Sequence, residues 1–184
     1  MNQLMGYIEN AATIGIAGHI RPDGDCVGSC MGLYHYILDN FQDKKVDVFL
    51  ESVPRTFAFL KGTEHIITDY PDKEPYDLFI ALDSSSFDRL GKADAYFKEA
   101  KMTVCVDHHI SNTAYAKETI VDAKASSTCE VLFEQLEEDK INHCVAEPLY
   151  IGIIFDTAVF KHSNTSPRTM CIGGILMGKG VEYT

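Results

Sequence analysis

The segment Met102-Thr-Val-Cys-Val-Asp-His-His109 decides the fold, because an apolar run typical of a buried strand ends there in one carboxylate and two imidazoles. Three further apolar segments also deliver an Asp or a His at their C-terminal ends. They are residues 13–18 before His19, 78–82 before Asp83, and 150–155 before Asp156. In open α/β sheets, sites form at the carboxyl ends of parallel strands. The pattern therefore predicts one polar site built from four segments.

The order of segments predicts an α/β fold with a mostly parallel sheet and helices on both faces. Strand-like runs alternate with helical spacing of apolar residues, which is the pattern of βαβ units. The stretch 146–155 stays open between strand and helix, since periodicity cannot assign a short apolar run. Pro167 predicts a helix over 166–178, capped by Thr165 or Ser166. The strand-like runs are 13–18, 46–50, 78–82 and 102–106, and the helical patterns span 25–40, 90–100 and 126–138.

Length and composition indicate a single globular domain. The 184 residues are 46% hydrophobic and 23% charged, which is ordinary for a protein with a self-sufficient core. The net charge of −11 repels polyanions, so we expect no long nucleic acid as a partner. A phosphorylated substrate would need local positive charge, which bound metal ions can supply.

The cysteine pattern indicates reduced thiols and a cytoplasmic location. No two cysteines form a C-x-x-C pair and several lie inside apolar runs, so we expect them to be buried and free. Residues 1–6 lack the basic and apolar regions of a signal peptide. No apolar stretch approaches ~20 residues, so no membrane span is expected. The cysteines are Cys26, Cys30, Cys105, Cys129, Cys144 and Cys171.

The turn after the first strand-like run brings polar side chains together. Pro22 and Gly24 make it tight, so that Asp23 and Asp25 are aimed into the same small volume as His19. Each acidic residue of the four segments, taken alone, is better explained as a helix cap or a turn residue than as a metal ligand. A single pattern of this kind is therefore a weak signal.

The four segments taken together indicate a metal centre. Three imidazoles and five carboxylates would repel one another if left unpaired, and burying uncompensated charge costs several kcal/mol per ion. Divalent cations remove that cost. Mixed His and Asp ligation suits Mn²⁺, Fe²⁺, Co²⁺ or Zn²⁺ better than Mg²⁺. The number of carboxylates favours two metals that share a bridging Asp, ~3.5–4 Å apart, which would clamp a phosphate and activate a water.

In this combination the segments resemble motifs one to four of the DHH phosphoesterase superfamily, from about residue 13 to the end of the chain. Segment four of that family usually reads Asp-Thr-Gly-x-Phe, and here Ala158 replaces the glycine. Further stretches resemble the branch of nano-RNases and phosphoadenosine-phosphate phosphatases, close to RecJ. These stretches are His19-Ile-Arg-Pro-Asp-Gly-Asp-Cys-Val-Gly-Ser29, Ala81-Leu-Asp83 with Asp88-Arg-Leu-Gly91, Asp107-His-His-Ile-Ser-Asn112 and Ala125-Ser-Ser-Thr-Cys-Glu130.

The resemblance implies a centre of two Mn²⁺ ions, with Mg²⁺ and Co²⁺ as alternative cofactors. His109 would face the substrate phosphate as a catalytic residue, and Asp107 would orient an imidazole, which is the usual partner of a ligating His. The nucleophile would be a water activated between the metals, so no protein nucleophile is required. The implied ligands are His19, Asp23 and Asp83 for one ion, and Asp25, Asp83, His108 and Asp156 for the other.

Four residues are candidates for substrate contact. Arg21 is explained equally well as a phosphate ligand and as an exposed loop residue. Ser126 and Ser127 open a predicted helix whose N-terminus would receive an anion, although they would also serve as caps with Glu130 nearby. His162 follows segment four closely in the sequence.

The resemblance implies a Mn²⁺-dependent hydrolase that acts on phosphate esters. Its expected substrates are short oligonucleotides (nanoRNA, linear dinucleotides) or nucleotide bisphosphates such as 3′-phosphoadenosine 5′-phosphate. Family members of this type carry a second, substrate-gripping domain of the DHHA1 type, with a Gly-Gly-Gly-His-like motif that residues 1–184 lack. We therefore expect the chain to be a DHH catalytic domain alone. Some family members dimerise, so the resemblance is compatible with a homodimer, but the sequence itself does not define the oligomeric state.

Two other functions compete with this interpretation. A manganese-dependent inorganic pyrophosphatase of the same superfamily typically shows an Asn-Pro-Asp turn, and Arg21-Pro22 stands against it. A non-catalytic module that binds metal or nucleotide is the second alternative. Intact ligand positions weaken that alternative, whereas the missing gripping domain supports it.

Overall fold

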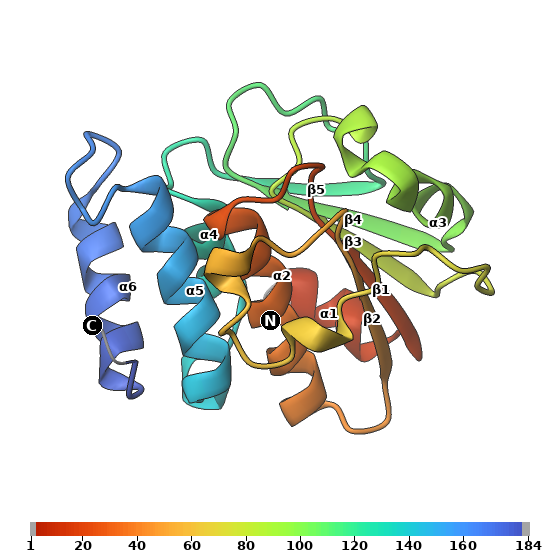
Figure 1. Ribbon diagram of the computed structural model, residues 1–184, viewed down its shortest axis with the longest axis horizontal. Coiled ribbons are helices and arrows are strands. Elements are labelled where there is room, and N and C mark those ends of the chain that lie inside the picture. The colour runs from red at the N-terminus through yellow and green to blue at the C-terminus, as the bar shows by residue number, and fades with distance from the viewer. Residues whose placement is uncertain (1–2, 182–184) are drawn as a thin grey trace.

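The structure is a computed structural model that describes residues 3–181; residues 1–2 of the N-terminal segment considered above, and residues 182–184, lie outside the described part. Within residues 3–181, five strands form one sheet in the order β2-β1-β3-β4-β5, and all neighbouring strands are parallel. The predicted parallel α/β fold is thus confirmed (Figure 1). The strands are β1 (Thr13–Ala17), β2 (Lys45–Phe49), β3 (Leu78–Leu82), β4 (Met102–Asp107) and β5 (Glu118–Val121).

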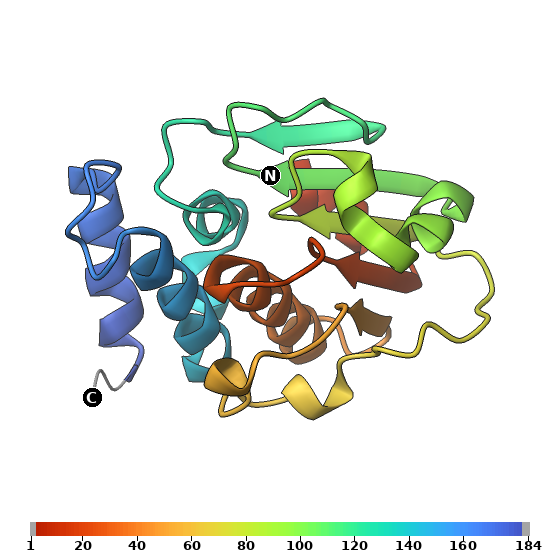
Figure 2. The same cartoon turned by 45° about the horizontal axis from the view of Figure 1, so that its top comes forward.

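Helices cover both faces of the sheet unequally (Figures 1 and 2). On one face, Ile16 and Ile80 belong to a large core shared with α1, α2, α4 and α5. On the other face, Phe79 packs with Tyr96 and Phe97 of α3 in a smaller, aromatic core. Helix α6 packs mainly against α5 and adds Ile172 and Leu176 to the large core. The helices are α1 (Gln3–Glu9), α2 (Gly24–Asn40), α3 (Asp94–Glu99), α4 (Thr128–Gln135), α5 (His143–Asp156) and α6 (Pro167–Gly178).

The four predicted strands are confirmed to within one residue at each end. Central strand β3 is buried along its whole length, which is the reason for its continuous apolar sequence. Strand β5 was not predicted. It is a four-residue edge strand whose residues are half-buried or exposed, so it carries no apolar run.

The segment 146–155, which stayed open between strand and helix in the sequence, is a helix. It belongs to α5, which begins at the cap residue Asn142, where the side chain accepts a hydrogen bond from the Val145 N–H. Helix α5 packs against α2 on one side and α6 on another, and a helix covered in this way is apolar around much of its circumference. Its periodicity is therefore hidden in the sequence, and Asp156 reaches the site from a helix end.

The remaining helix predictions differ in detail from the structure. Helices α2 and α6 lie where predicted, and Ser166 caps α6 in a reciprocal capping box with Thr169. Helix α4 is shorter than the predicted 126–138. The predicted helix 90–100 divides into a 3₁₀ turn, Phe87–Ala93, and α3, because Gly91 has a positive φ of 56°.

All six cysteines are free, as predicted, but only four are buried. Cys144 is half-buried and Cys171 is exposed, which corrects the expectation that all six lie in the core. In the part of the chain that the structure describes, no helix combines the length and apolar character needed to span a membrane.

Candidate metal centre

The loop after β1 contributes His19 and Asp23, and α2 begins with Asp25. One oxygen of Asp23 caps α2 by accepting hydrogen bonds of 3.1 Å from the N–H groups of Asp25 and Cys26. Its other oxygen lies 3.7 Å from Nε2 of His19. Asp23 is therefore a helix cap that still presents one free oxygen to the imidazole, so capping and metal ligation are compatible.

Asp83 lies at the centre of the cluster, directly after β3. It is 2% exposed, and its backbone has a positive φ of 53°, a conformation that few residues besides Gly, Asn and Asp adopt. One carboxylate oxygen lies 3.4 Å from His19 Nε2, and the other lies 3.8 Å from His108 Nε2. Asp83 thus faces two separate imidazoles through its two oxygens.

His108 joins the second group of ligands. Its Nε2 lies 3.3 Å from an oxygen of Asp156, at the end of α5, and 3.9 Å from an oxygen of Asp25. Together with Asp83, these residues come from α2, the end of β3, the loop after β4, and α5. All six predicted metal ligands therefore meet in one cluster.

His109 lies beside this cluster and is held by Asp107, the last residue of β4. Its Nδ1 lies 2.7 Å from one oxygen of Asp107, whose other oxygen accepts a 2.7 Å hydrogen bond from the side-chain amide of Asn112. Burial favours the neutral carboxyl, but the bonds from His109 and Asn112 lower the pKa of Asp107. In turn Asp107 raises the pKa of His109. Asn112 was not predicted as a site residue, although it ends the segment 107–112.

The N-terminus of α4 binds two of the acidic residues. The N–H groups of Thr128 and Cys129 donate to the two oxygens of Asp25, at 2.6 and 2.9 Å, and the Thr128 hydroxyl donates to Asp83 at 3.0 Å. The positive end of the helix dipole stabilises an anion here. The anion in this structure is a carboxylate of the chain itself. The contact of the Thr128 hydroxyl with Asp83 was not predicted.

Burial and mutual repulsion disfavour the charged carboxylates of the cluster. Burial, followed by the nearby charge of Asp83, raises the pKa of Asp25 to about 7. Burial and Asp25 raise the pKa of Asp156 to about 8. Burial lowers the pKa of His19, but Asp23 and Asp83 outweigh it and raise that pKa to about 11. The imidazoles alone do not balance the negative charge of the carboxylates, so the cluster favours the binding of additional positive charge.

Divalent cations fit this arrangement. The N···O separations within the two groups of ligands range from 3.3 to 3.9 Å. Ligand atoms bound ~2.1 Å from one ion lie about 3 Å apart, so small side-chain movements would complete both coordination shells. The mixed His and Asp donors favour Mn²⁺ or a similar transition metal over Ca²⁺.

Cys26 is a further potential ligand close to the cluster. It can present its sulfur within ligand distance of His19 and Asp83. Its thiol, however, points to the backbone oxygen of His19, and burial raises the pKa of the thiol. Cys26 is therefore a protonated thiol that supports the loop, and it is not one of the predicted ligands.

The predicted substrate-contacting serines lie beneath the cluster. Both are fully buried; Ser126 Oγ donates to Glu130 at 2.5 Å, and Ser127 Oγ accepts from the Glu130 N–H. The Glu130 carboxylate also accepts from Thr169 of α6 and lies 3.6 Å from Nε of Arg168. These contacts join α4 to α6. Substrate contact by the two serines stays a prediction.

Arg21 and His162 lie on the exposed rim of the cluster. Arg21 has a positive φ of 54°, and its backbone N–H donates to Glu51 at 2.8 Å. His162 Nδ1 lies 3.2 Å from the backbone oxygen of Asp156. Between Asp156 and His162 the chain turns through three consecutive residues with positive φ, Ala158–Phe160. Arg21 and His162 are thus near the ligands, and their contact with substrate stays a prediction.

Comparison with known proteins agrees with this geometry. The DHH family, N-terminal domain, matches residues 13–153, which is more than half of the chain. The chain belongs to the DHH family. This match extends from β1 into α5 and so includes five of the six predicted ligands, all except Asp156.

Two of the curated relatives of this chain carry the same protein name. The bifunctional oligoribonuclease and PAP phosphatase NrnA of Bacillus subtilis is 30% identical over 183 residues, covering 95% of this chain and 56% of the relative. The protein of the same name from Mycoplasma genitalium is 30% identical over 194 residues, with 96% and 56% covered. This DHH chain therefore spans little more than half the length of the curated relatives it matches.

A solved structure supports the fold. The crystal structure of an exopolyphosphatase-related protein from Bacteroides fragilis superposes with a TM-score of 0.85, at 24% identity over 97% of this chain and 56% of that one. At this identity the likeness shows the fold alone, and it agrees with the parallel DHH sheet described above.

Proposed function

We propose that this DHH chain hydrolyses phosphate esters of short oligoribonucleotides or nucleotide bisphosphates with the help of two divalent metal ions. The observation that carries the proposal is Asp83, whose two oxygens face His19 and His108 at 3.4 and 3.8 Å. A carboxylate placed in this way is suited to bridge two ions. No serine or cysteine of the cluster is paired with a base as an activated nucleophile requires, so hydrolysis by water fits best.

His19, Asp23 and Asp83 would hold one ion, and Asp25, Asp83, His108 and Asp156 would hold the other. Two such ions clamp a phosphate and lower the pKa of a bound water. Mn²⁺ is the proposed metal, because both groups mix imidazole with carboxylate.

His109 would act on the substrate phosphate. Its ring is about two-fifths exposed and is fixed by Asp107 through Nδ1, so Nε2 is free to donate to a phosphate oxygen. Asp107 keeps the imidazole oriented and favours its protonated form, which would stabilise the negative charge that develops during hydrolysis.

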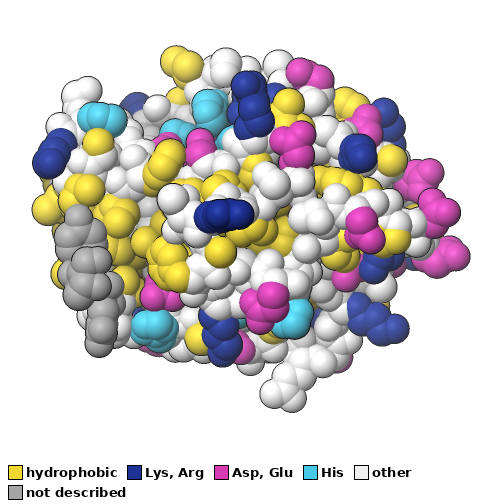
Figure 3. Space-filling view, in the orientation of Figure 1, with side chains coloured by type: hydrophobic (Ala, Val, Ile, Leu, Met, Phe, Trp, Pro, Cys, Tyr) yellow, Lys and Arg dark blue, Asp and Glu magenta, His cyan; other side chains and the backbone are white. Residues whose placement is uncertain are grey.

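Short substrates fit the charge of the chain. The net charge is −11, and the lysines and arginines on the face shown in Figure 3 are scattered among acidic and apolar side chains. Long polyanions would be repelled. The names of the curated relatives, oligoribonuclease and PAP phosphatase, suggest the substrate class. The cytoplasmic location, a single catalytic domain and a homodimer stay predictions.

Calorimetric titration of the metal-free protein with Mn²⁺ tests the proposal, together with the hydrolysis of a 5′-phosphorylated diadenylate. We expect two ions per chain. We expect Asp83→Ala to lose both and to reduce hydrolysis by about a thousand-fold or more, while Asp72→Ala, at an exposed position, behaves like the parent. One ion or none in the parent would contradict the dinuclear centre.

Inorganic pyrophosphate is the competing substrate in the same assay. Faster turnover of pyrophosphate than of the dinucleotide would replace the proposal by the pyrophosphatase alternative. Tight nucleotide binding without any Mn²⁺-dependent hydrolysis of either compound would favour a non-catalytic module.

A further inference from the structure

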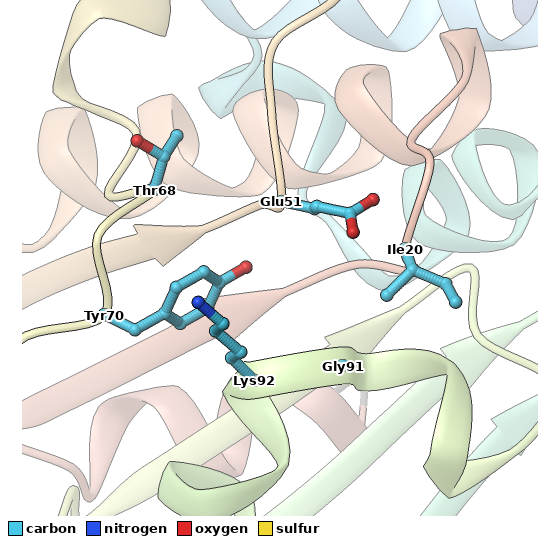
Figure 4. A pocket seen from close by; sticks show the side chains of 6 residues that line it. All are labelled: Ile20, Glu51, Thr68, Tyr70, Gly91 and Lys92. Carbon is cyan, nitrogen blue, oxygen red and sulfur yellow. The ribbon is translucent and has the colours of Figure 1, made fainter.

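A cavity opens on the same edge of the sheet as the metal centre. Its volume is about 300 Å³, at the lower end of the range for small-molecule sites. In Figure 4, Tyr70 and Lys92 lie on one side of the cavity, and Glu51 and Ile20 lie across from them. The residues that line it are Ile20, Glu51, Thr68, Tyr70, Gly91 and Lys92.

The position of this cavity follows from the strand order. Strand β1 leads to β2 on one side, whereas β3 leads to β4 on the other, so the topology switches between β1 and β3. Open α/β sheets bind ligands in the crevice at such a point. Ile20 follows β1, Glu51 follows β2 and Gly91 follows β3, which places the cavity at that crevice.

The cavity and the metal centre share one loop. Ile20 lines the cavity and directly follows the ligand His19, whose Nδ1 lies 2.8 Å from the Ile20 backbone oxygen. The next residue, Arg21, donates its backbone N–H to Glu51 at 2.8 Å and so holds that side chain. A molecule with its phosphate at the metals would therefore have this cavity beside it.

Tyr70 offers a rigid aromatic surface in the cavity. Its ring stacks on Phe49, with centroids 6.0 Å apart, and on Tyr96, 6.5 Å apart. Burial and the Glu51 carboxylate raise the pKa of Tyr70 to about 12, so the phenol stays neutral. Lys92 Nζ lies 5.9 Å from the centre of the ring, on a long flexible side chain that a flat ligand can displace.

The charges of the cavity select a neutral ligand with both donors and acceptors. Glu51 would repel a phosphate group, and its carboxylate accepts N–H donors. Lys92 donates to carbonyl oxygens or ring nitrogens. A nucleobase combines a flat ring with such groups along its edge. Guanine presents two neighbouring N–H donors beside the acceptor O6, which matches a cavity lined by both a carboxylate and an ammonium more completely than adenine or cytosine does.

We propose that this cavity binds the base of the substrate, stacked on Tyr70, and that Glu51 and Lys92 make it prefer guanine. The inference deepens the proposed function, because it assigns the base next to the phosphate that the metals would hold. It does not require metal for its test, since a nucleoside has no phosphate.

Calorimetric titration of the protein in chelator with guanosine, adenosine and cytidine tests the inference. We expect saturable binding of guanosine, at least tenfold tighter than binding of cytidine. Glu51→Gln and Lys92→Met should each weaken guanosine binding at least fivefold. Both side chains are exposed, so unchanged melting temperatures should show that the fold is intact. The matched control is Glu99→Gln, at an exposed position on α3, which should bind guanosine like the parent.

Absence of saturable nucleoside binding would overturn the inference, and so would equal affinity of the Glu51→Gln variant and the parent. The outcome is independent of the proposed function. Mn²⁺-dependent hydrolysis without guanosine binding would remove the base site and leave the function. Guanosine binding without hydrolysis would leave the base site and contradict the proposed function.

Discussion

The parallel sheet carries aspartates at both ends, and the pKa of Asp77 at one end is shifted in the opposite direction to those of three aspartates of the metal cluster at the other. At the N-terminal end, Asp77 precedes β3 and accepts hydrogen bonds from the N–H groups of Ala12 and Thr13, at 3.0 and 3.1 Å, and from Lys101 at 2.8 Å. Lys101, followed by the two N–H groups, lowers the pKa of Asp77 to about 2. The protein itself therefore supplies the hydrogen bonds and the ion pair that stabilise the ionised form of Asp77.

At the C-terminal end, burial and neighbouring carboxylates raise the pKa values of Asp25, Asp83 and Asp156. The difference teaches that this fold can give an aspartate a full set of hydrogen-bond and ion-pair partners at a position where the aspartate only stabilises the end of a strand. At the other end it collects carboxylates and leaves part of their charge unbalanced. Neutral substitutions of Asp156 and of Asp77 should therefore change the free energy of unfolding of the metal-free protein in opposite directions.

The largest effect is expected from Gly152→Ala in α5. A Cβ at this position would overlap the sulfur of Cys129 and lie 2.8 Å from Asp25 Oδ1. We expect a loss of about 2–3 kcal/mol in the free energy of unfolding, measured in urea, because the packed core cannot absorb the extra atom. Gly174→Ala in α6 is the control. A Cβ there meets nothing within 4 Å, so helix propensity should raise stability slightly. Equal effects of the two variants would contradict the tight packing around Asp25.

Thr128→Val should weaken metal binding without unfolding the protein. It removes the hydroxyl that donates to Asp83 at 3.0 Å but keeps the shape of the side chain and the N–H that binds Asp25. Groups that orient metal ligands are typically worth ten- to a hundredfold in affinity. We expect about a tenfold loss in Mn²⁺ affinity by titration, and Thr128→Ser should restore it. A valine variant with the affinity of the parent would remove Thr128 from the centre.

Asp156→Asn should stabilise the metal-free protein. It replaces a half-buried carboxylate that is repelled by Asp25 with a neutral side chain of similar size. We expect a gain on the order of 1 kcal/mol in the unfolding free energy in chelator at pH 7.5. In saturating Mn²⁺ the parent should be the more stable protein, because the variant lacks a ligand. A destabilised variant in chelator would show that the charge at this end of the sheet is already balanced.

The smallest effect is expected from Asp77→Asn at the opposite end. We expect a loss of about 0.5–1 kcal/mol at pH 7, since solvent screens the partly exposed pair with Lys101. The folded pKa of Asp77 is lower than the unfolded one, so its contribution is present above about pH 4 and disappears as the pH falls towards 2. Urea unfolding at pH 7 and pH 2.5 should show the difference between parent and variant shrinking. A constant difference would exclude the ionised carboxylate as its source.

Much of the fold and the cluster was predictable, because the relevant signals are local. The strands β1, β3 and β4 are buried on both faces, so each is a continuous apolar run in the sequence. Each run ends directly in polar residues, and this change of composition located the strand. Edge strand β5 lacks that signal. Helix α5 was hidden because neighbouring helices cover it, which removes the polar stripe that periodicity detects.

By itself, the sequence determined which residues are predicted to meet at the metal cluster. His19, Asp83, His108 and Asp156 stand at the ends of apolar segments, and that placement follows from the order of residues along the chain. Only the tertiary structure decided how they are supported. Thr128 reaches Asp83, and Glu51 meets the loop of His19, across long separations in the chain. Such contacts depend on how strands and helices pack, and no local pattern of side chains records them.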